Sequence, residues 1–259
     1  MKRSIILMYH IIDKPLSDVE ARYCCTQRQF ERQMRFLKES NYRVISLDNL
    51  VDGLGGKSQI PENAVVVTFD DGFESSYYNA LPVLTRYNIP ATMFIVSDRV
   101  GSSNDWMLSR GFPHRKIMSW SQLRELTDAG ICLGSHTQNH PDLTELSNGS
   151  VRDEVRISKQ ILEDAIGKSV SYFAYPYGLF NQKVQNAVEE AGYRAACSTR
   201  SGFNGCDIDH FALRRIAVYG GDSLWKFSRK IKFGTNEMNI LFPATYYSKR
   251  LVARLGLTG

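Results

Sequence analysis

The sequence predicts an α/β protein whose parallel sheet forms a single distorted (β/α)7-8 barrel, and three observations favour this fold class. Short apolar runs alternate with amphipathic helical patterns along most of the chain. The run at residues 64–69 is apolar except for Thr68, which is typical of a strand buried on both faces. Alternation that continues over about eight strand candidates favours a barrel over the alternative, an open doubly wound sheet.

The expected elements follow one another in a regular order. Strands are expected at residues 4–9, 42–46, 64–69, 91–96, 131–134, 171–175, 193–198 and 213–218. Helices are expected from Thr26, near 75–87, from an N-cap at Ser121, at 151–166, at 181–191 and near 223–231. No linker, low-complexity segment or repeat divides the chain. We therefore expect one barrel domain over residues 1–218, followed by an extension over 219–259.

Composition excludes several classes of protein. A chain of 259 residues with 43% hydrophobic and 23% charged content is neither disordered nor collagen-like. No apolar run approaches the ~18 to 20 residues of a membrane-spanning helix, and the first run is shorter than the ~7 to 15 residues of a secretory signal. The five cysteines show no Cys-x-x-Cys spacing, which is typical of reduced thiols. We expect a cytoplasmic protein.

The net charge of +5 lies in the extension at residues 219–259, which contains seven Lys or Arg and two acidic residues. Its basic, amphipathic stretches are typical of helices that lie on an anionic membrane, here the inner face. They are equally typical of helices that pack on a barrel with a solvated basic face. We therefore expect a basic helical extension and keep both alternatives. No nucleic-acid motif accompanies the charge.

Polar residues follow four of the expected strands, at the ends where βα barrels carry their chemistry. The segments are Tyr-His at 9–10, Thr-Phe-Asp-Asp-Gly at 68–72, Ser-His-Thr-Gln-Asn-His at 135–140 and Tyr-Pro-Tyr-Gly at 175–178. Because parallel strands end at the same rim, we expect the four segments to meet.

Asp70, Asp71, His136 and His140 form a candidate metal site. Adjacent carboxylates at the end of a buried strand are unfavourable unless a cation or an acid-base task uses them, although Asp-Gly alone also fits a turn. A His-x3-His pair can share one ion, although isolated pairs are often caps or core residues. Together they favour one carboxylate and two imidazoles, suited to zinc or ferrous iron, with the other Asp as a base. Which Asp has which role stays open.

Three motifs in this order resemble the polysaccharide deacetylase family, also called carbohydrate esterase family 4 or NodB homology domains. They are Thr-Phe-Asp-Asp-Gly, Ser-His-Thr-x-Asn-His-Pro-x-Leu and Phe-x-Tyr-Pro-Tyr-Gly, and the match runs from about residue 64 to 220. The resemblance implies a distorted βα barrel and metal-dependent hydrolysis of N-acetyl groups on amino sugars. It implies that Asp71, His136 and His140 bind the metal and that Asp70 is the general base.

The sequence departs from the family pattern in two places. Many members carry an Arg four residues before the Gly of the third motif, where it braces the catalytic Asp, and this chain has Ala174 there. Arg214 or Arg215 is a candidate replacement, and a solvated or structural Arg is the alternative. The late Leu-x-His motif that supplies the general acid is also absent. Tyr9-His10 resembles the early pair of a subset like the poly-N-acetylglucosamine deacetylases, which implies that His10 is the acid; a histidine that caps the strand end is the alternative.

The expected function is therefore de-N-acetylation of an amino sugar in the biosynthesis of a surface glycan such as an exopolysaccharide, a capsule or lipopolysaccharide. The expected metal is Zn²⁺, with Fe²⁺, Co²⁺ and Ni²⁺ as alternatives. The resemblance implies that the Tyr177 N–H holds the oxyanion, and Tyr175, Tyr177 and Trp106 are candidates to stack on a sugar, with a core role as the alternative. If the extension meets a membrane, the substrate is lipid-linked or nucleotide-linked. The alternative functions are a non-catalytic glycan-binding relative, a deformylase or imidase, and a ferrous oxygenase.

Overall fold

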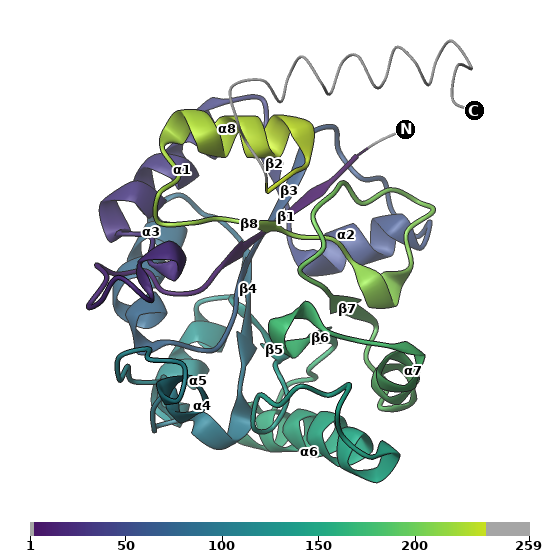
Figure 1. Ribbon diagram of the computed structural model, residues 1–259. Coiled ribbons are helices and arrows are strands. Elements are labelled where there is room, and N and C mark those ends of the chain that lie inside the picture. The colour runs from purple at the N-terminus through teal and green to yellow at the C-terminus, as the bar shows by residue number, and fades with distance from the viewer. Residues whose placement is uncertain (1–2, 237–259) are drawn as a thin grey trace, which may run out of the picture.

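The apolar runs form eight parallel strands of one strongly curled sheet in the computed structural model, which describes residues 3–236 (Figure 1). The order across the sheet is β7-β6-β5-β4-β3-β1-β8, and β2 pairs with β3. The strands are β1 (Ile5–Tyr9), β2 (Arg43–Val44), β3 (Ala64–Phe69), β4 (Ala91–Ile95), β5 (Cys132–Ser135), β6 (Tyr172–Ala174), β7 (Ala195–Cys197) and β8 (Ile216–Ala217).

The two ends of the sheet meet where the segment before β8 lies beside β7. Cys197 forms a parallel bridge with Leu213, and the backbone N–H of Ser198 donates to the Leu213 carbonyl at 2.8 Å. We call this contact the seam. It makes the curled sheet a distorted βα barrel and confirms the predicted fold class. The doubly wound alternative is wrong, because the strand order advances in one direction without a central reversal.

Helices surround the sheet (Figure 1). They are α1 (Gln27–Glu39), α2 (Leu47–Leu54), α3 (Leu81–Arg86) after a π-helical segment Ser76–Ala80, α4 (Asp105–Leu108), α5 (Trp120–Asp128), α6 (Asn148–Ile166), α7 (Gln182–Glu190) and α8 (Leu224–Phe233). Thr26 caps α1 as expected. The expected cap Ser121 is wrong by two residues, because Ser119 forms a capping box with Gln122 at the third helical position.

Strand alternation divides the apolar core into two layers. Ile5 and Leu7 of β1 face outward and belong to the cluster that includes the buried face of α1, whereas Ile6 belongs to an inner cluster. Phe94 of β4 is part of the same inner cluster. The buried residues of α2 also belong to it, so this helix, which the sequence analysis missed, covers the interior of the barrel.

The described part of the extension packs on the barrel through α8. Phe227 is buried and its ring centroid lies 6.1 Å from that of Phe36 on α1. The buried Lys230 forms an ion pair with Asp222 at 2.5 Å and donates to the Ala217 carbonyl at 3.0 Å. Within residues 3–236, no helix is long and apolar enough to cross a membrane. The later basic stretch, residues 246–255, lies outside the described residues, and the division of the chain at residue 218 stays a prediction.

Gly134 of β5 lies where a side chain would collide with the inner layer. A Cβ there would lie 2.4 Å from Phe94 Cδ1 and 3.0 Å from the Tyr172 carbonyl oxygen. We expect Gly134→Ala to lower the free energy of unfolding by ~1–3 kcal/mol, measured by urea denaturation, because the strand or the Phe94 ring must shift. Gly149→Ala in α6 is the control, since its nearest atom is Ser147 Oγ at 3.9 Å. Equal stability of Gly134→Ala and the wild type would contradict the close packing.

Candidate active site

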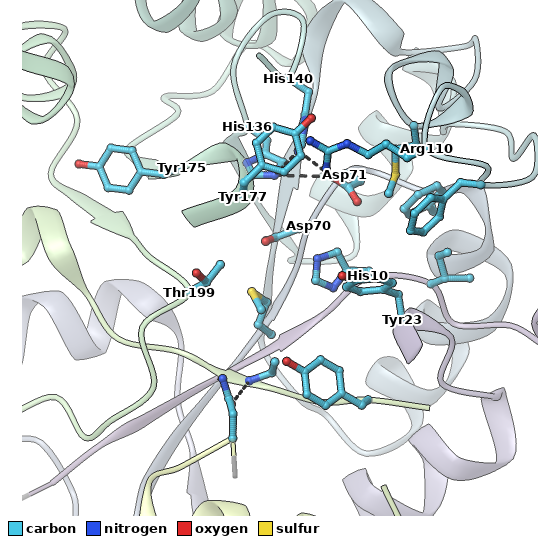
Figure 2. A pocket seen from close by; sticks show the side chains of 18 residues that line it. His10, Tyr23, Asp70, Asp71, Arg110, His136, His140, Tyr175, Tyr177 and Thr199 are labelled. Carbon is cyan, nitrogen blue, oxygen red and sulfur yellow. Dashed lines mark hydrogen bonds and ion pairs between the residues drawn. The ribbon is translucent and has the colours of Figure 1, made fainter. Parts of the chain in front are cut away.

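The inward-facing rows of two neighbouring strands carry polar residues into the carboxyl end of the barrel. His10 continues the row of Ile6 on β1, and Asp70 continues the row of Val66 on β3. Both side chains line a cavity of about 360 Å³ (Figure 2). The predicted meeting of strand-end residues therefore occurs inside this cavity.

Asp71 reaches the same cavity because the strand alternation stops there. Its backbone is left-handed, with φ 73°, and Gly72 follows with φ 79°. In a regular strand Asp71 would point away from Asp70, whereas this turn brings both carboxylates to the cavity. A Cβ at Gly72 would also lie 3.1 Å from Ile95 Cδ1, so glycine suits both the conformation and the packing.

The two histidines lie on a tight loop after β5. Thr137 and His140 have φ 69° and 62°, and the Thr137 Oγ1 accepts the backbone N–H of His140 at 2.8 Å. The Nε2 atoms of His136 and His140 are 3.2 Å apart. Asp71 Oδ1 lies 3.5 Å from Nε2 of His136 and 3.4 Å from Nε2 of His140, along the dashed lines of Figure 2.

These three atoms fit one divalent cation. A triangle with these sides has a point about 2 Å from each corner, the distance at which zinc binds imidazole nitrogen and carboxylate oxygen. The Nδ1–H of His136 donates to the Ala174 carbonyl at 2.7 Å, which leaves its Nε2 lone pair for the ion. Burial lowers the pKa of His136 to about 4, against the charge of Asp70, so the imidazole is neutral as a ligand must be. Asp71, His136 and His140 thus form a possible metal site.

Asp70 is paired with Arg215, which resolves the alternatives left open by Ala174. The guanidinium NH1 donates to Asp70 Oδ1 at 2.6 Å and NH2 to Oδ2 at 2.8 Å, and Arg215 is fully buried. Burial alone would raise the pKa of Asp70, but the charge of Arg215 leads the effects that lower it below its usual value. Arg214 is exposed. Arg215, and not Arg214, therefore pairs with Asp70, and it is not a solvated side chain.

His10 lies beside the two aspartates in Figure 2, on the other side of the cavity from Tyr177. Its half-buried ring packs against Tyr23, with centroids 5.3 Å apart. Burial raises the pKa of both aspartates, and His10 is among the charged groups that lower it, after Arg215 and His136 for Asp70 and after His140 for Asp71. The structure therefore brings the expected acid together with the expected base and metal ligands.

Tyr175 does not present a ring face to the cavity. It shares the outward row of Phe173, its ring is 0% exposed and stacks on Phe180 at 4.5 Å, and its hydroxyl donates to the Phe211 carbonyl at 2.9 Å. In Figure 2 it points away from the other labelled residues. Although Tyr175 borders the cavity, the expectation that its ring stacks on a sugar is not supported, because both faces are enclosed. Its core alternative fits.

Tyr177 lies at the cavity beside the histidines. Its backbone is left-handed, with φ 58°, and its N–H makes no hydrogen bond within residues 3–236. Its ring lies edge-on to His140 at 4.7 Å, and the Arg110 guanidinium lies 4.3 Å from the ring centroid. Trp106 also stacks on His140, with ring centroids 5.2 Å apart, so it contacts a candidate ligand, and it is not among the residues that line the cavity.

The residues that line the cavity and that the sequence analysis missed include Tyr23, Arg110, Thr199 and Tyr219. Arg110, Thr199 and Tyr219 lie on loops and Tyr23 ends a three-residue 3-10 helix, Ala21–Tyr23, and in such segments neither helical nor strand periodicity predicts which side chain faces inward. Thr199 had one indirect signal, the glycine of the Tyr-Pro-Tyr-Gly segment. A Cβ at Gly178 would lie 2.0 Å from Thr199 Oγ1, so this position requires glycine.

A parallel βα barrel with aspartates and histidines at its carboxyl rim is an arrangement typical of hydrolases. The sequence model of the family described as polysaccharide deacetylase matches residues 57–196, which is more than half of the chain. The chain therefore belongs to the polysaccharide deacetylase family, whose members are hydrolases that act on amide bonds of polysaccharides.

Named relatives agree with this family. The poly-β-1,6-N-acetyl-D-glucosamine N-deacetylase of Staphylococcus epidermidis is 28% identical over 238 residues, covering 83% of this chain and 78% of that protein. The crystal structure of BC0361, a polysaccharide deacetylase from Bacillus cereus, has a TM-score of 0.75 and 26% identity, covering 89% of this chain and 69% of the other. The Streptococcus pyogenes deacetylase PplD, at TM-score 0.76 and 24% identity, covers 88% of this chain and 98% of its own and shows the shared fold.

The pair formed by Asp70 and Arg215 has a measurable effect on stability. We expect Arg215→Ala to lower the free energy of unfolding by ~3–5 kcal/mol, because it leaves a buried carboxylate without its cation. Arg215→Lys keeps the charge but loses the two-pronged contact, so it should lose less. The exposed neighbour Arg214 is the control, and Arg214→Ala should change stability by no more than ~0.5 kcal/mol. Similar losses for the two alanine variants in denaturant titrations would contradict this role of Arg215.

Proposed function

We propose that this protein is a metal-dependent de-N-acetylase that hydrolyses the acetamide of an N-acetylated amino sugar during the biosynthesis of a surface glycan. The observation that carries the proposal is the triangle of donor atoms from Asp71, His136 and His140, set beside an Asp70 that Arg215 holds in place. The name of the S. epidermidis relative, a deacetylase of poly-N-acetylglucosamine, supports an acetylated amino sugar as the substrate.

In this proposal Asp71, His136 and His140 hold the metal, with Zn²⁺ expected first and Fe²⁺, Co²⁺ or Ni²⁺ as alternatives. When bound, such a cation acidifies a water molecule and polarises the acetyl carbonyl. Buried neutral imidazoles and an ionised carboxylate suit a divalent ion, because they supply lone pairs and one compensating charge. The cavity of about 360 Å³ leaves room for a sugar beside them.

Asp70 acts as the general base in this scheme. Each of its oxygens accepts one hydrogen bond from Arg215, and each carboxylate oxygen has a second lone pair for the proton of the attacking water. The lowered pKa keeps Asp70 ionised at neutral pH, and the fixed guanidinium keeps its orientation.

His10 and Tyr177 act on the other parts of the substrate. His10 donates a proton to the sugar nitrogen as the amide bond breaks, so that an amine leaves. The unpaired backbone N–H of Tyr177 is free to stabilise the negative charge that develops on the carbonyl oxygen. The ring of Tyr177, with Arg110 above it, offers a wall for the sugar. The support for these roles is that all the groups line one cavity.

The cellular setting is part of the proposal. We propose a cytoplasmic protein and a substrate linked to a lipid or a nucleotide, on the grounds of the basic segment 219–259. Contact of that segment with a membrane stays a prediction, since residues 237–259 lie outside the described part of the chain.

Acetate release tests the function directly. We expect the purified protein to release acetate from at least one member of a panel of N-acetylated sugars, nucleotide sugars and oligomers. A chelator should abolish release, because the metal is required, and added Zn²⁺ or Co²⁺ should restore it. No acetate from any substrate by metal-loaded protein, or release that a chelator leaves unchanged, would contradict the proposal.

Metal analysis of variants distinguishes the proposed base, Asp70, from a proposed metal ligand, His136. We expect Asp70→Asn to retain the metal while kcat falls by roughly 10²- to 10⁴-fold, because only the base is lost. His136→Ala should lose both metal and turnover. His114→Ala, on an exposed loop residue, is the control and should keep both. A full metal content in His136→Ala, measured by elemental analysis, would show that the ligand assignment is wrong.

Removal of His10 tests the acid role. We expect His10→Ala to keep its metal and to lose roughly 10²- to 10⁴-fold in kcat, because the amine must leave without its proton donor. Unchanged turnover with a full metal content would assign the acid role to another group.

A further inference from the structure

The loop that carries both histidines is fastened to α6 by one carboxylate. Glu154 Oε2 accepts the backbone N–H groups of Gln138 and Asn139, both at 2.9 Å. Its Oε1 accepts the side-chain amide of Asn139 at 3.0 Å. Gln138 and Asn139 are two of the three residues between His136 and His140, so Glu154 binds the segment that sets how far apart the two imidazoles lie.

The opposite side of the loop is held by the segment after β4, through backbone hydrogen bonds and through the side-chain amide of Gln138, which donates to Asp98 Oδ2 at 2.9 Å. The carbonyls of Thr137 and Gln138 accept the N–H groups of Ser97 and Asp98, which follow β4. The loop is therefore fixed between the end of β4 and α6, through its carbonyls on one side and its N–H groups on the other. Glu154 is the acceptor for the backbone N–H groups of both Gln138 and Asn139.

The part of α6 that carries Glu154 is packed firmly on the sheet. Glu154 lies between Val151 and Val155, which are fully buried against the sheet, and the buried Ser158 one turn further on contacts Ser135 at the end of β5 through their hydroxyls. α6 is thus attached to the end of β5, immediately before the histidine loop. A side chain anchored on such a helix holds its acceptor atoms in one place.

The loop needs this support because its backbone is unfavourable. Thr137 and His140 both have left-handed φ values, which non-glycine residues rarely adopt. Two adjacent N–H groups that point the same way require an acceptor that carries no hydrogen of its own. A carboxylate meets this requirement, and the charge shortens and strengthens both bonds, whereas a Gln side chain supplies one acceptor and places an NH₂ group beside donors.

We infer that Glu154 is a positioning residue for the candidate metal site, which fixes the loop between the two histidines and so sets the separation of their Nε2 atoms at 3.2 Å. This inference rests on the proposed function, because it concerns the affinity of Asp71, His136 and His140 for a divalent cation. Glu154 does not touch either imidazole, and it acts through the backbone between them.

Metal titration tests the inference. Chelator-stripped wild type, Glu154→Gln and Glu154→Asp are titrated with Zn²⁺ and with Co²⁺ against a competing chromophoric chelator. We expect Glu154→Gln to bind each ion roughly 10- to 100-fold more weakly, as for other groups that orient metal ligands. Glu154→Asp keeps the charge on a shorter side chain and should lie between Glu154→Gln and the wild type. The visible absorption spectrum of the Co²⁺-saturated Glu154→Gln protein should also differ from that of the wild type, because the ligand geometry has changed.

Glu163→Gln is the matched control on the same helix. Glu163 also accepts a backbone N–H, that of Val170 at 2.8 Å, but at the far end of α6 from the histidine loop. Its removal should lower the melting temperature of the metal-free protein by an amount similar to Glu154→Gln while leaving the metal affinity and the Co²⁺ spectrum unchanged. This comparison separates positioning of the ligands from a general loss of stability.

The outcomes distinguish the inference from the proposed function. A folded Glu154→Gln protein that binds both ions within twofold of the wild type, with the same Co²⁺ spectrum, would overturn the inference and leave the metal site standing. Equal loss of affinity in Glu163→Gln would overturn it as well. A wild-type protein that binds neither ion would overturn the proposed function, and the inference with it.

Discussion

In a curled parallel sheet every inward-facing row of side chains ends at the same rim, and this constraint organises the whole molecule. Rows that are apolar deep in the barrel, through Ile6 and Val66, end in His10 and Asp70. Burial of these charged groups is tolerated only because each has a partner of opposite charge or a hydrogen-bonding group beside it. Asp70 faces Arg215, and Asp71 faces two imidazoles that together leave space for a cation.

The site then depends on the places where regular structure stops. The left-handed turn at Asp71 puts two consecutive carboxylates on one side of the chain, and the left-handed residues of the histidine loop place two imidazole nitrogens in contact distance. Tyr177, also left-handed, leaves a backbone N–H free at the cavity. The regular strands thus determine how far along the barrel the site lies, and these three left-handed turns determine which way its side chains and the Tyr177 N–H point.

Much of the fold follows from local sequence pattern, as β3 illustrates: its apolar run gave both bounds of the strand. α2 was missed although Ser46 caps it and its buried residues Leu47, Leu50, Val51 and Leu54 follow helical spacing, because its eight residues are fewer than the ~11–18 over which that spacing is assessed. The candidate metal ligands were accessible through motif spacing. Arg215 could not be chosen over Arg214, because both precede β8 and this two-residue strand shows no alternation from which to predict the inward-facing side chain. Tyr175, in contrast, shares the row of Phe173, and that alternation was present in the sequence.

Arg215 also crosses the interior of the barrel. Its Nε donates to the carbonyl of Ser198 at the seam, while its other nitrogens reach Thr68 and Asp70 on β3. The residue that orients the proposed base thus also joins the two ends of the sheet. Under the proposed mechanism, selection for folding and selection for hydrolysis act on the same pair. A descendant of this chain that lost its catalytic activity would retain Asp70 and Arg215 as architecture, and the histidines, free of that duty, would be the first to diverge.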